Sequence, residues 1–323
     1  MPMKGILAAH ADWSVDARKR FVTVTRRATR GWTVAAPVPV GPVTDFLQRV
    51  LRAANGAPVA LGVDFPLGLP RAYAARHAQR DYHQGNFYGF LRGLLTRPEF
   101  FQVCAELTEV SPARPFYPVR GIRGMTRAAH AAALGLPGAA ALSRLCDRAT
   151  ANRPAGAPLF WTLGANQAGK AAIAAWRDML VPALAPTLAA QAPIDLWPFA
   201  GPFRALLAPG RVAMAETYPA EALRHLGLRI PGSKRRQANR LAMEGNLRAV
   251  MAALGAHPHR ALSEALADGF GADAAGEDRF DSFLGALCVI NVLEGNRPDT
   301  APDDPWLTRW EGWVLGQTDM PCS

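Results

Sequence analysis

Four acidic residues lie where the sequence pattern ends a strand or begins a helix. Asp12 and Asp64 each follow an apolar run, and Glu216 ends another short apolar run. Asp281 lies at the start of a helical pattern of apolar residues. We expect these four carboxylates to converge on one divalent-metal site and to act as its catalytic residues.

Carboxylates that lie close together repel one another unless cations lie among them, so their convergence would itself indicate a metal site. Hydrolysis of a phosphodiester at neutral pH needs an activated water and neutralised charge. A pair of Mg²⁺ ions roughly 4 Å apart supplies both. Hard cations take oxygen ligands, so the expected cofactor is Mg²⁺ or Mn²⁺.

Each acid also has a structural interpretation. Asp12 could cap a turn, and the nearby Asp16 competes with it for a functional role. Glu216 could be a salt-bridged strand residue. Asp278 and Asp281 could be a helix cap and a first-turn acid, and Asp278 is an alternative ligand to Asp281. Asp64 is the strongest candidate, because an unpaired carboxylate in an apolar run is costly to bury.

The elements that position these acids follow from hydrophobic patterns. Apolar runs predict three short strands in an antiparallel meander, a helix, and a central strand, in this order: 4–11, 20–27, 32–36, 43–54 and 59–63. A further short strand is expected at 211–219 and a last small strand at 311–315. Late helices are expected at 220–226, 236–254 and 259–268, and around Asp281.

Residues 71–204 interrupt the α/β pattern with helical stretches and loops rich in Arg and Pro. We expect helices at 72–82, 86–95, 127–150 and 168–190. The predicted organisation is an α/β core made of 1–70 and 205–323, with 71–204 as a helical insertion or subdomain. The order of the core elements is that of the RNase H-like fold, a mixed sheet with an antiparallel three-strand meander, parallel strands and flanking helices.

Composition sets the broad class. Half of the 323 residues are hydrophobic and 19% are charged, which permits a sizeable core. Lys and Arg outnumber Asp and Glu by 36 to 26, and a net charge of +10 attracts polyanions such as nucleic acid. The four cysteines are far apart, as expected of reduced thiols. Neither an export signal nor a long apolar span is evident, so we expect a cytoplasmic protein that does not enter a membrane.

Several segments resemble a family of uncharacterised proteins that are predicted to be RNase H-like nucleases. The resemblance rests on ADWSVDARKR, GVDFPLGLP, AETYPAEALRHLG, DRFDSFLGAL and the closing EGWV. It covers most of the α/β parts and little of 71–204. It implies functional roles for Asp64, Glu216 and Asp281, and more loosely for Asp12. The implied activity is metal-dependent hydrolysis of nucleic acid, with DNA or RNA and the oligomeric state left open.

Two basic segments suggest substrate contacts or rival functions. Lys234, Arg235 and Arg236 open a helix and could contact phosphate, although such clusters are often solvated surface. Residues 164–170 nearly match a phosphate-binding loop, but Ala171 replaces the Ser or Thr that binds Mg²⁺. Lys170 could therefore contact a substrate phosphate or serve a nucleotide-binding ATPase. The other alternative is a non-catalytic nucleic-acid-binding protein.

Overall fold

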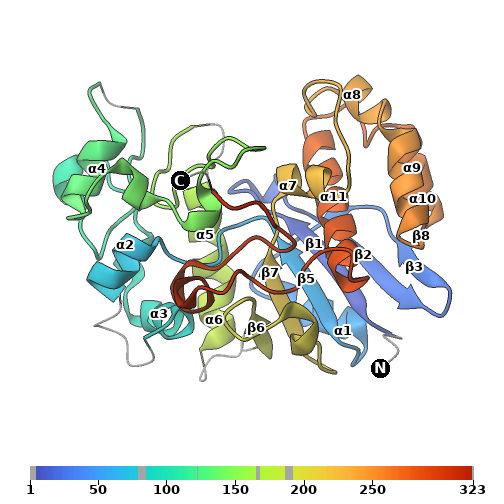
Figure 1. The fold of residues 1–323 in the computed structure, drawn as a ribbon, viewed down its shortest axis with the longest axis horizontal. Coiled ribbons are helices and arrows are strands. Elements are labelled where there is room, and N and C mark those ends of the chain that lie inside the picture. The colour runs from blue at the N-terminus through green and yellow to red at the C-terminus, as the bar shows by residue number, and fades with distance from the viewer. Residues whose placement is uncertain (1–4, 79–84, 122, 165–167, 186–191, 322–323) are drawn as a thin grey trace.

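An eight-stranded mixed sheet forms the centre of the computed structural model, which describes residues 5–78, 85–121, 123–164, 168–185 and 192–321 (Figure 1). Its strands are β1 Leu7–Asp12, β2 Phe21–Ala28, β3 Gly31–Val34, β4 Val38–Pro39, β5 Val59–Val63, β6 Ile194–Leu196, β7 Val212–Glu216 and β8 Ala256–Pro258. The strand order is β6-β7-β5-β1-β2-β3-β8, and β4 pairs with β2.

The sheet combines the predicted meander with parallel strands. β1, β2 and β3 pair antiparallel in sequence order, and β5 runs parallel to β1 with β7 parallel to β5. The fold is therefore α/β with a mixed sheet flanked by helices, as the patterns indicated. The edge strand β6 lies within 71–204, so the segment expected to be a helical insertion also contributes to the sheet.

Helices flank this sheet on both faces, and others lie to one side of it. The helices are α1 Phe46–Ala54, α2 Arg71–Tyr73, α3 Phe87–Gly93, α4 Arg127–Ala133, α5 Ala168–Ala175, α6 Val181–Leu184, α7 Pro219–His225, α8 Gln237–Leu241, α9 Glu244–Ala253, α10 Arg260–Ala267 and α11 Gly276–Leu293. Of these, α2, α3 and α4 lie together to one side of the sheet (Figure 1). Among the described residues, none of the helices has the length and apolar character needed to cross a membrane.

Some predicted boundaries were wrong. The helix expected at 127–150 ends at Ala133, and two short 3₁₀ turns follow. The helix expected at 236–254 is divided into α8 and α9. The strand expected at 311–315 does not form, because a π-helical turn at Leu307–Glu311 leads into an irregular segment. Tertiary contacts, which the local sequence pattern does not contain, override helix and strand propensity in these segments.

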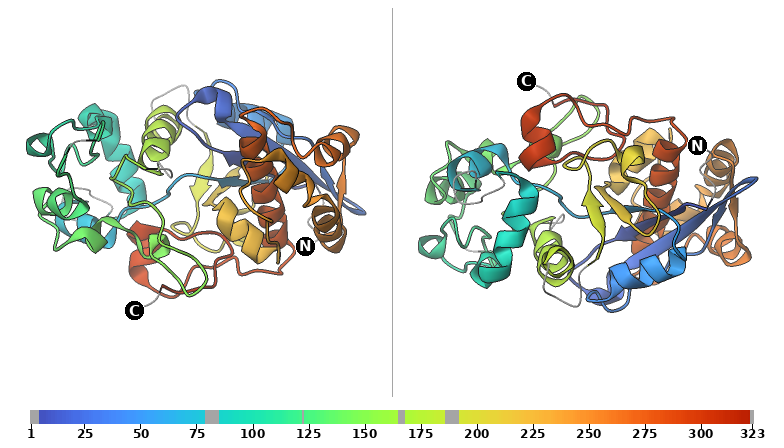
Figure 2. Two further views of the ribbon diagram at one scale, coloured as in Figure 1. Left: turned by 90° about the horizontal axis from the view of Figure 1, so that it is seen from above. Right: turned by 90° about the horizontal axis from the view of Figure 1, so that it is seen from below.

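The two faces of the sheet pack against different helices. α1 covers one face and α11 the other (Figure 2). Successive strand residues alternate between faces, so Leu61 packs in the core that contains α1, whereas Ala60 packs in the core that contains α11. By the same alternation, Asp12 and Asp64 end their strands on the α11 face. Glu216 follows Met214 and lies on the opposite face.

Close contact between α11 and β1 determines the height of α11 above the sheet. The ring of the buried His10 donates from Nδ1 to the Ser282 carbonyl at 3.2 Å, and Ser282 Oγ donates to the His10 carbonyl at 3.2 Å. Burial lowers the pKa of His10 to about 3, so the ring is neutral. A Cβ on Gly285 would lie 2.3 Å from this ring. Only a glycine lets the helix approach so closely.

We therefore expect Gly285→Ala to destabilise the protein by about 1–3 kcal/mol, because the added methyl must displace His10 or lift α11. Gly245→Ala in α9 is the matched control, since a Cβ there meets no atom within 4 Å. It should leave stability unchanged or slightly raised. Urea unfolding followed by circular dichroism measures both, and equal effects from the two variants would contradict the close-packing argument.

Candidate functional site

A pocket of about 620 Å³ opens at the carboxyl ends of β1, β5 and β7. Parallel strands place their ends at one edge, and the register pairs Ala11 with Val63 and Val63 with Glu216. The pocket has the α/β core on one side and residues of 144–171 on the other. Five of the six acids named from the sequence line it, namely Asp12, Asp64, Glu216, Asp278 and Asp281.

Asp12 and Asp64 are neighbours on the α11 face of the sheet. Burial raises the pKa of Asp12 well above its usual range, and the nearby Asp281 and Asp64 carboxylates add to this. Burial likewise raises the pKa of Asp64 to about 7, with a further contribution from Asp281. The Asp64 carboxylate contributes to the raised pKa of Asp12, so the two acids lie close enough to repel each other when both are charged.

Asp281 lies in the second turn of α11 and faces the same pair. The sequence pattern placed Asp281 at the start of this helix, but the helix begins at Gly276. Its Oδ2 binds the Lys234 ammonium. Its Oδ1 is buried and has no hydrogen-bond partner among the described residues. Burial raises the pKa of Asp281, although Lys234 opposes the rise.

Asp278 lies one turn earlier in α11, closer to the mouth of the pocket. Burial raises its pKa to about 6, which Lys19 opposes. Its Oδ2 is also buried without a hydrogen-bond partner in the described part of the chain. Asp278 and Asp281 both line the pocket, so the structure brings together the two residues that the sequence offered as alternatives.

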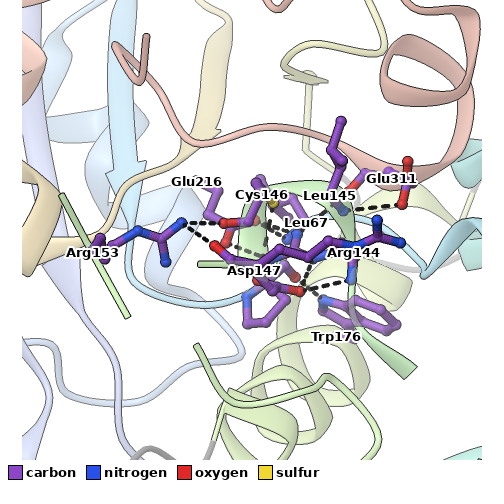
Figure 3. A network of polar contacts seen from close by, with 11 residues as sticks. Leu67, Arg144, Leu145, Cys146, Asp147, Arg153, Trp176, Glu216 and Glu311 are labelled. Atoms are coloured by element: carbon purple, nitrogen blue, oxygen red, sulfur yellow. Dashed lines mark hydrogen bonds and ion pairs between the residues drawn. The ribbon is translucent and has the colours of Figure 1, made fainter. Parts of the chain in front are cut away.

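Glu216 is at the pocket wall but is already paired with a cation (Figure 3). Arg144 donates to its Oε1 from Nη2 at 2.7 Å and to its Oε2 from Nη1 at 2.6 Å. The backbone N–H of Leu67 donates to Oε2 at 2.8 Å. Burial raises the pKa of Glu216, and Arg144 opposes that effect. Both carboxylate oxygens are therefore occupied within the protein.

Arg144 and Asp147 are site residues that the sequence did not reveal. The Arg144 side chain is fully buried and also pairs with Asp147 at 2.9 Å. A basic and an acidic residue three apart are typical of an exposed helix surface, and these two fall in the stretch that was expected to be helical. Nothing local distinguishes them from such a pair. Only the contact with Glu216, 72 residues away, reveals their place.

The structure separates Asp12 from its competitor. Asp16 caps the short 3₁₀ turn Ala17–Lys19 by accepting from Arg18 N at 3.0 Å. Its side chain also pairs with the Arg18 guanidinium at 2.9 Å, which lowers the pKa of Asp16 to about 2. Asp16 is not among the residues lining the pocket. The turn-capping interpretation therefore applies to Asp16, and Asp12 is the acid at the site.

The expected basic contacts divide into two groups. Lys234 and Arg235 line the pocket, as does Lys19, which the sequence did not single out. Arg235 is largely exposed and pairs with Glu277 at 3.5 Å. Arg236 is exposed outside the pocket lining. The mouth of an acidic site thus carries basic side chains that can meet an anionic substrate.

The segment that resembles a phosphate loop is only partly described, since 165–167 lie outside the described residues. The preceding run Leu159–Leu163 forms a turn and an isolated bridge instead of a strand. Ala168 and Ala171 of α5 line the pocket, whereas Lys170 between them does not. Lys170 is therefore not part of the pocket wall that the acidic residues form.

The acidic side chains of the pocket are of the type that binds a divalent cation, but they are not arranged around a common point. Among the described residues, no three His, Cys, Asp or Glu side chains are arranged to hold a metal ion. Glu216 and one oxygen of Asp281 already bind basic side chains. Oδ2 of Asp278 and Oδ1 of Asp281 are buried without partners in the described part of the chain, and burial raises the pKa of Asp12 and Asp64, as expected where a cation would relieve repulsion. Asp12, Asp64 and Asp281 Oδ1 thus offer oxygen donors of the type that a hard cation takes, although their present arrangement is not that of a metal site.

Comparison with protein-family models, with curated proteins and with solved structures found no match to this chain. The function is therefore argued from the geometry and chemistry of the site.

Arg144→Met should destabilise the protein by about 3–5 kcal/mol, because Glu216 would remain buried without its cation. Arg148→Met is the matched control: Arg148 is exposed, and its loss should change stability by less than about 0.5 kcal/mol. The double variant Arg144→Met/Glu216→Gln should recover much of the loss. Chemical denaturation measures all three, and a double variant no more stable than Arg144→Met would refute the charge argument.

Proposed function

We propose that this protein is a divalent-metal-dependent hydrolase of phosphodiester bonds in nucleic acid. The observation that carries the proposal is the convergence of Asp12 at the end of β1, Asp64 after β5 and Asp281 of α11 in one pocket, where Oδ1 of Asp281 is buried without a hydrogen-bond partner among the described residues. These residues are far apart in the sequence, and only Asp281 is paired with a basic side chain, so burial of the other two carboxylates is costly. Binding of Mg²⁺ or Mn²⁺ would offset the cost of burying these carboxylates.

An RNase H-like fold is part of the proposal. The order of the central strands, β3-β2-β1-β5-β7, supports it: an antiparallel meander is followed by strands parallel to β1. The acids at the ends of β1 and β5 and on the last long helix, α11, are where such a fold would place a metal site. The resemblance of GVDFPLGLP and DRFDSFLGAL to predicted RNase H-like nucleases agrees with this placement.

The chain's own residues divide the work. Asp12, Asp64 and Asp281 Oδ1 would hold the ion, which supplies an activated water and neutralises charge on the phosphate. Glu216 and Arg144 maintain the pocket wall by neutralising one another. Lys19 and Arg235 at the mouth would bind phosphates of the substrate backbone, and the net charge of +10 favours a polyanion. These contacts suit either DNA or RNA.

Mn²⁺ should stabilise the parent protein and should not stabilise Asp64→Asn to the same extent. At one hundred times its dissociation constant, a ligand adds about 2.7 kcal/mol to the free energy of unfolding. Loss of one carboxylate weakens binding and should remove most of this increase. Asp16→Asn is the matched control, because Asp16 is a nearby acid outside the pocket. It should retain the full Mn²⁺ effect in a thermal melt.

Nuclease activity should depend on Asp64 and not on Asp16, as Mn²⁺ binding should. Hydrolysis of single-stranded DNA or RNA in Mg²⁺ should be lost in Asp64→Asn and kept in Asp16→Asn. An equal Mn²⁺ effect in the parent and Asp64→Asn would show that the metal site is wrong. Binding of nucleic acid without hydrolysis would favour a non-catalytic binding protein. Stabilisation by ATP that Lys170→Ala abolishes would favour the nucleotide-binding alternative.

Without metal, the Asp64 carboxyl should make stability depend on pH in a defined direction. Its pKa rises from 3.8 in an unperturbed chain to about 7 in the folded protein. The folded state thus binds this proton more tightly, so its contribution to stability is complete below about pH 4 and is lost as pH rises through about 7.

The amide in Asp64→Asn does not ionise, so this variant lacks the pH dependence that the Asp64 carboxyl causes. The melting temperature of Asp64→Asn minus that of the parent, measured in a chelator, should therefore increase from pH 4 to pH 8. The subtraction removes the pH dependence of groups that do not interact with Asp64. A difference that stays constant over this range would contradict the raised pKa.

A further inference from the structure

We propose that Lys234 takes the place of a second metal ion, so that this site binds one divalent cation together with one ammonium group. The inference rests on the proposed metal-dependent function and specifies how the site is charged. The sequence suggested Lys234 only as a contact for substrate phosphate. Its position in the structure points inward, to the acids.

Lys234 is bound directly to a carboxylate of the site. Its Nζ contacts Asp281 Oδ2 and lies 3.7 Å from Glu277 Oε1. The Lys234 side chain is 32% exposed, against 74% for Arg235 beside it. Asp281 is 6% exposed, and its other oxygen, Oδ1, has no partner among the described residues. Asp281 would therefore help to hold a metal ion with Oδ1 while Oδ2 remains bound to Lys234.

Lys234 shares the pocket with the whole cluster of acids. Its side chain lines the pocket together with Asp12, Asp64, Asp278 and Asp281, and the ammonium is bound to Asp281. A positive charge in this position compensates buried carboxylates, as a resident cation would.

The backbone around Lys234 holds the residue in this position. The buried Arg240 donates from Nη1 to the Lys234 carbonyl at 2.5 Å and from Nε to the Gly269 carbonyl at 2.8 Å. Asn239 Nδ2 donates to the Ser233 carbonyl at 2.9 Å. These bonds tie the segment before α8 to the loop before α11. A lysine on a solvated surface would not need such support.

Electrostatics then limits the number of ions. One divalent ion held by Asp12, Asp64 and Asp281 Oδ1 would relieve the repulsion among these carboxylates. A second ion would compete with Lys234 for Asp281 Oδ2, and an ammonium beside two divalent ions would be repelled by both. The parent site should therefore hold one Mn²⁺, and removal of the Lys234 charge should admit another.

The test is the number of Mn²⁺ ions bound per chain, measured by isothermal titration calorimetry and by electron paramagnetic resonance of free Mn²⁺. The parent should bind one ion. Lys234→Met keeps the length of the side chain without its charge and should bind two. Arg236→Met is the matched control: it removes the same charge from the same segment outside the pocket, and it should bind one. Circular dichroism checks that each variant is folded.

Each outcome decides the proposal. Two ions on the parent would overturn it, as would one ion on both the parent and folded Lys234→Met. An ion that binds only after Lys234 is replaced would also overturn it, since Lys234 would then block the site. No Mn²⁺ on any variant would instead refute the metal-dependent function itself. If Lys234→Met does not fold, Lys234→Gln replaces it, and the count on the parent still separates one ion from two.

Discussion

Burial of negative charge at one edge of the sheet is the constraint on which the rest of this structure depends. Carboxylates removed from water are tolerated only when a cation or a proton compensates them. The protein meets this requirement in two ways. Arg144 compensates Glu216 completely, through two short hydrogen bonds. Burial and neighbouring carboxylates raise the pKa of Asp12 and Asp64, so a proton or a cation is bound more readily at this site.

The alternation of strand residues explains why the acids behave so differently. Asp12 and Asp64 leave their strands on the face covered by α11, where Asp281 also lies. Glu216 leaves β7 on the other face, where Arg144 from the 71–204 segment reaches it. The segment that interrupts the α/β pattern therefore does more than surround the core. It supplies the positive charge that makes one wall of the pocket possible, while a lysine near α8 supplies the charge on the other wall.

Close packing of α11 links the core to this chemistry. His10 lies two residues before Asp12, and Gly285 lies one turn after Asp281. The contact between His10 and Gly285 therefore determines how far the carboxylate of α11 stands from the end of β1. Close packing of the core is therefore also needed for the arrangement of charge at the site. An added methyl group that moved α11 away from the sheet would also move Asp281 away from Asp12 and Asp64.

The sequence by itself determined the α/β class, the meander, the central strand and the acids at the ends of strands, because hydrophobic periodicity and strand ends are local properties of the chain. Tertiary structure alone decided how those acids are compensated. Glu216 meets Arg144 across 72 residues, and Asp281 meets Lys234 across 47. The sequence pattern made both acids look alike as metal ligands. Pairing between distant charges depends on the path of the whole chain, and no local spacing encodes it.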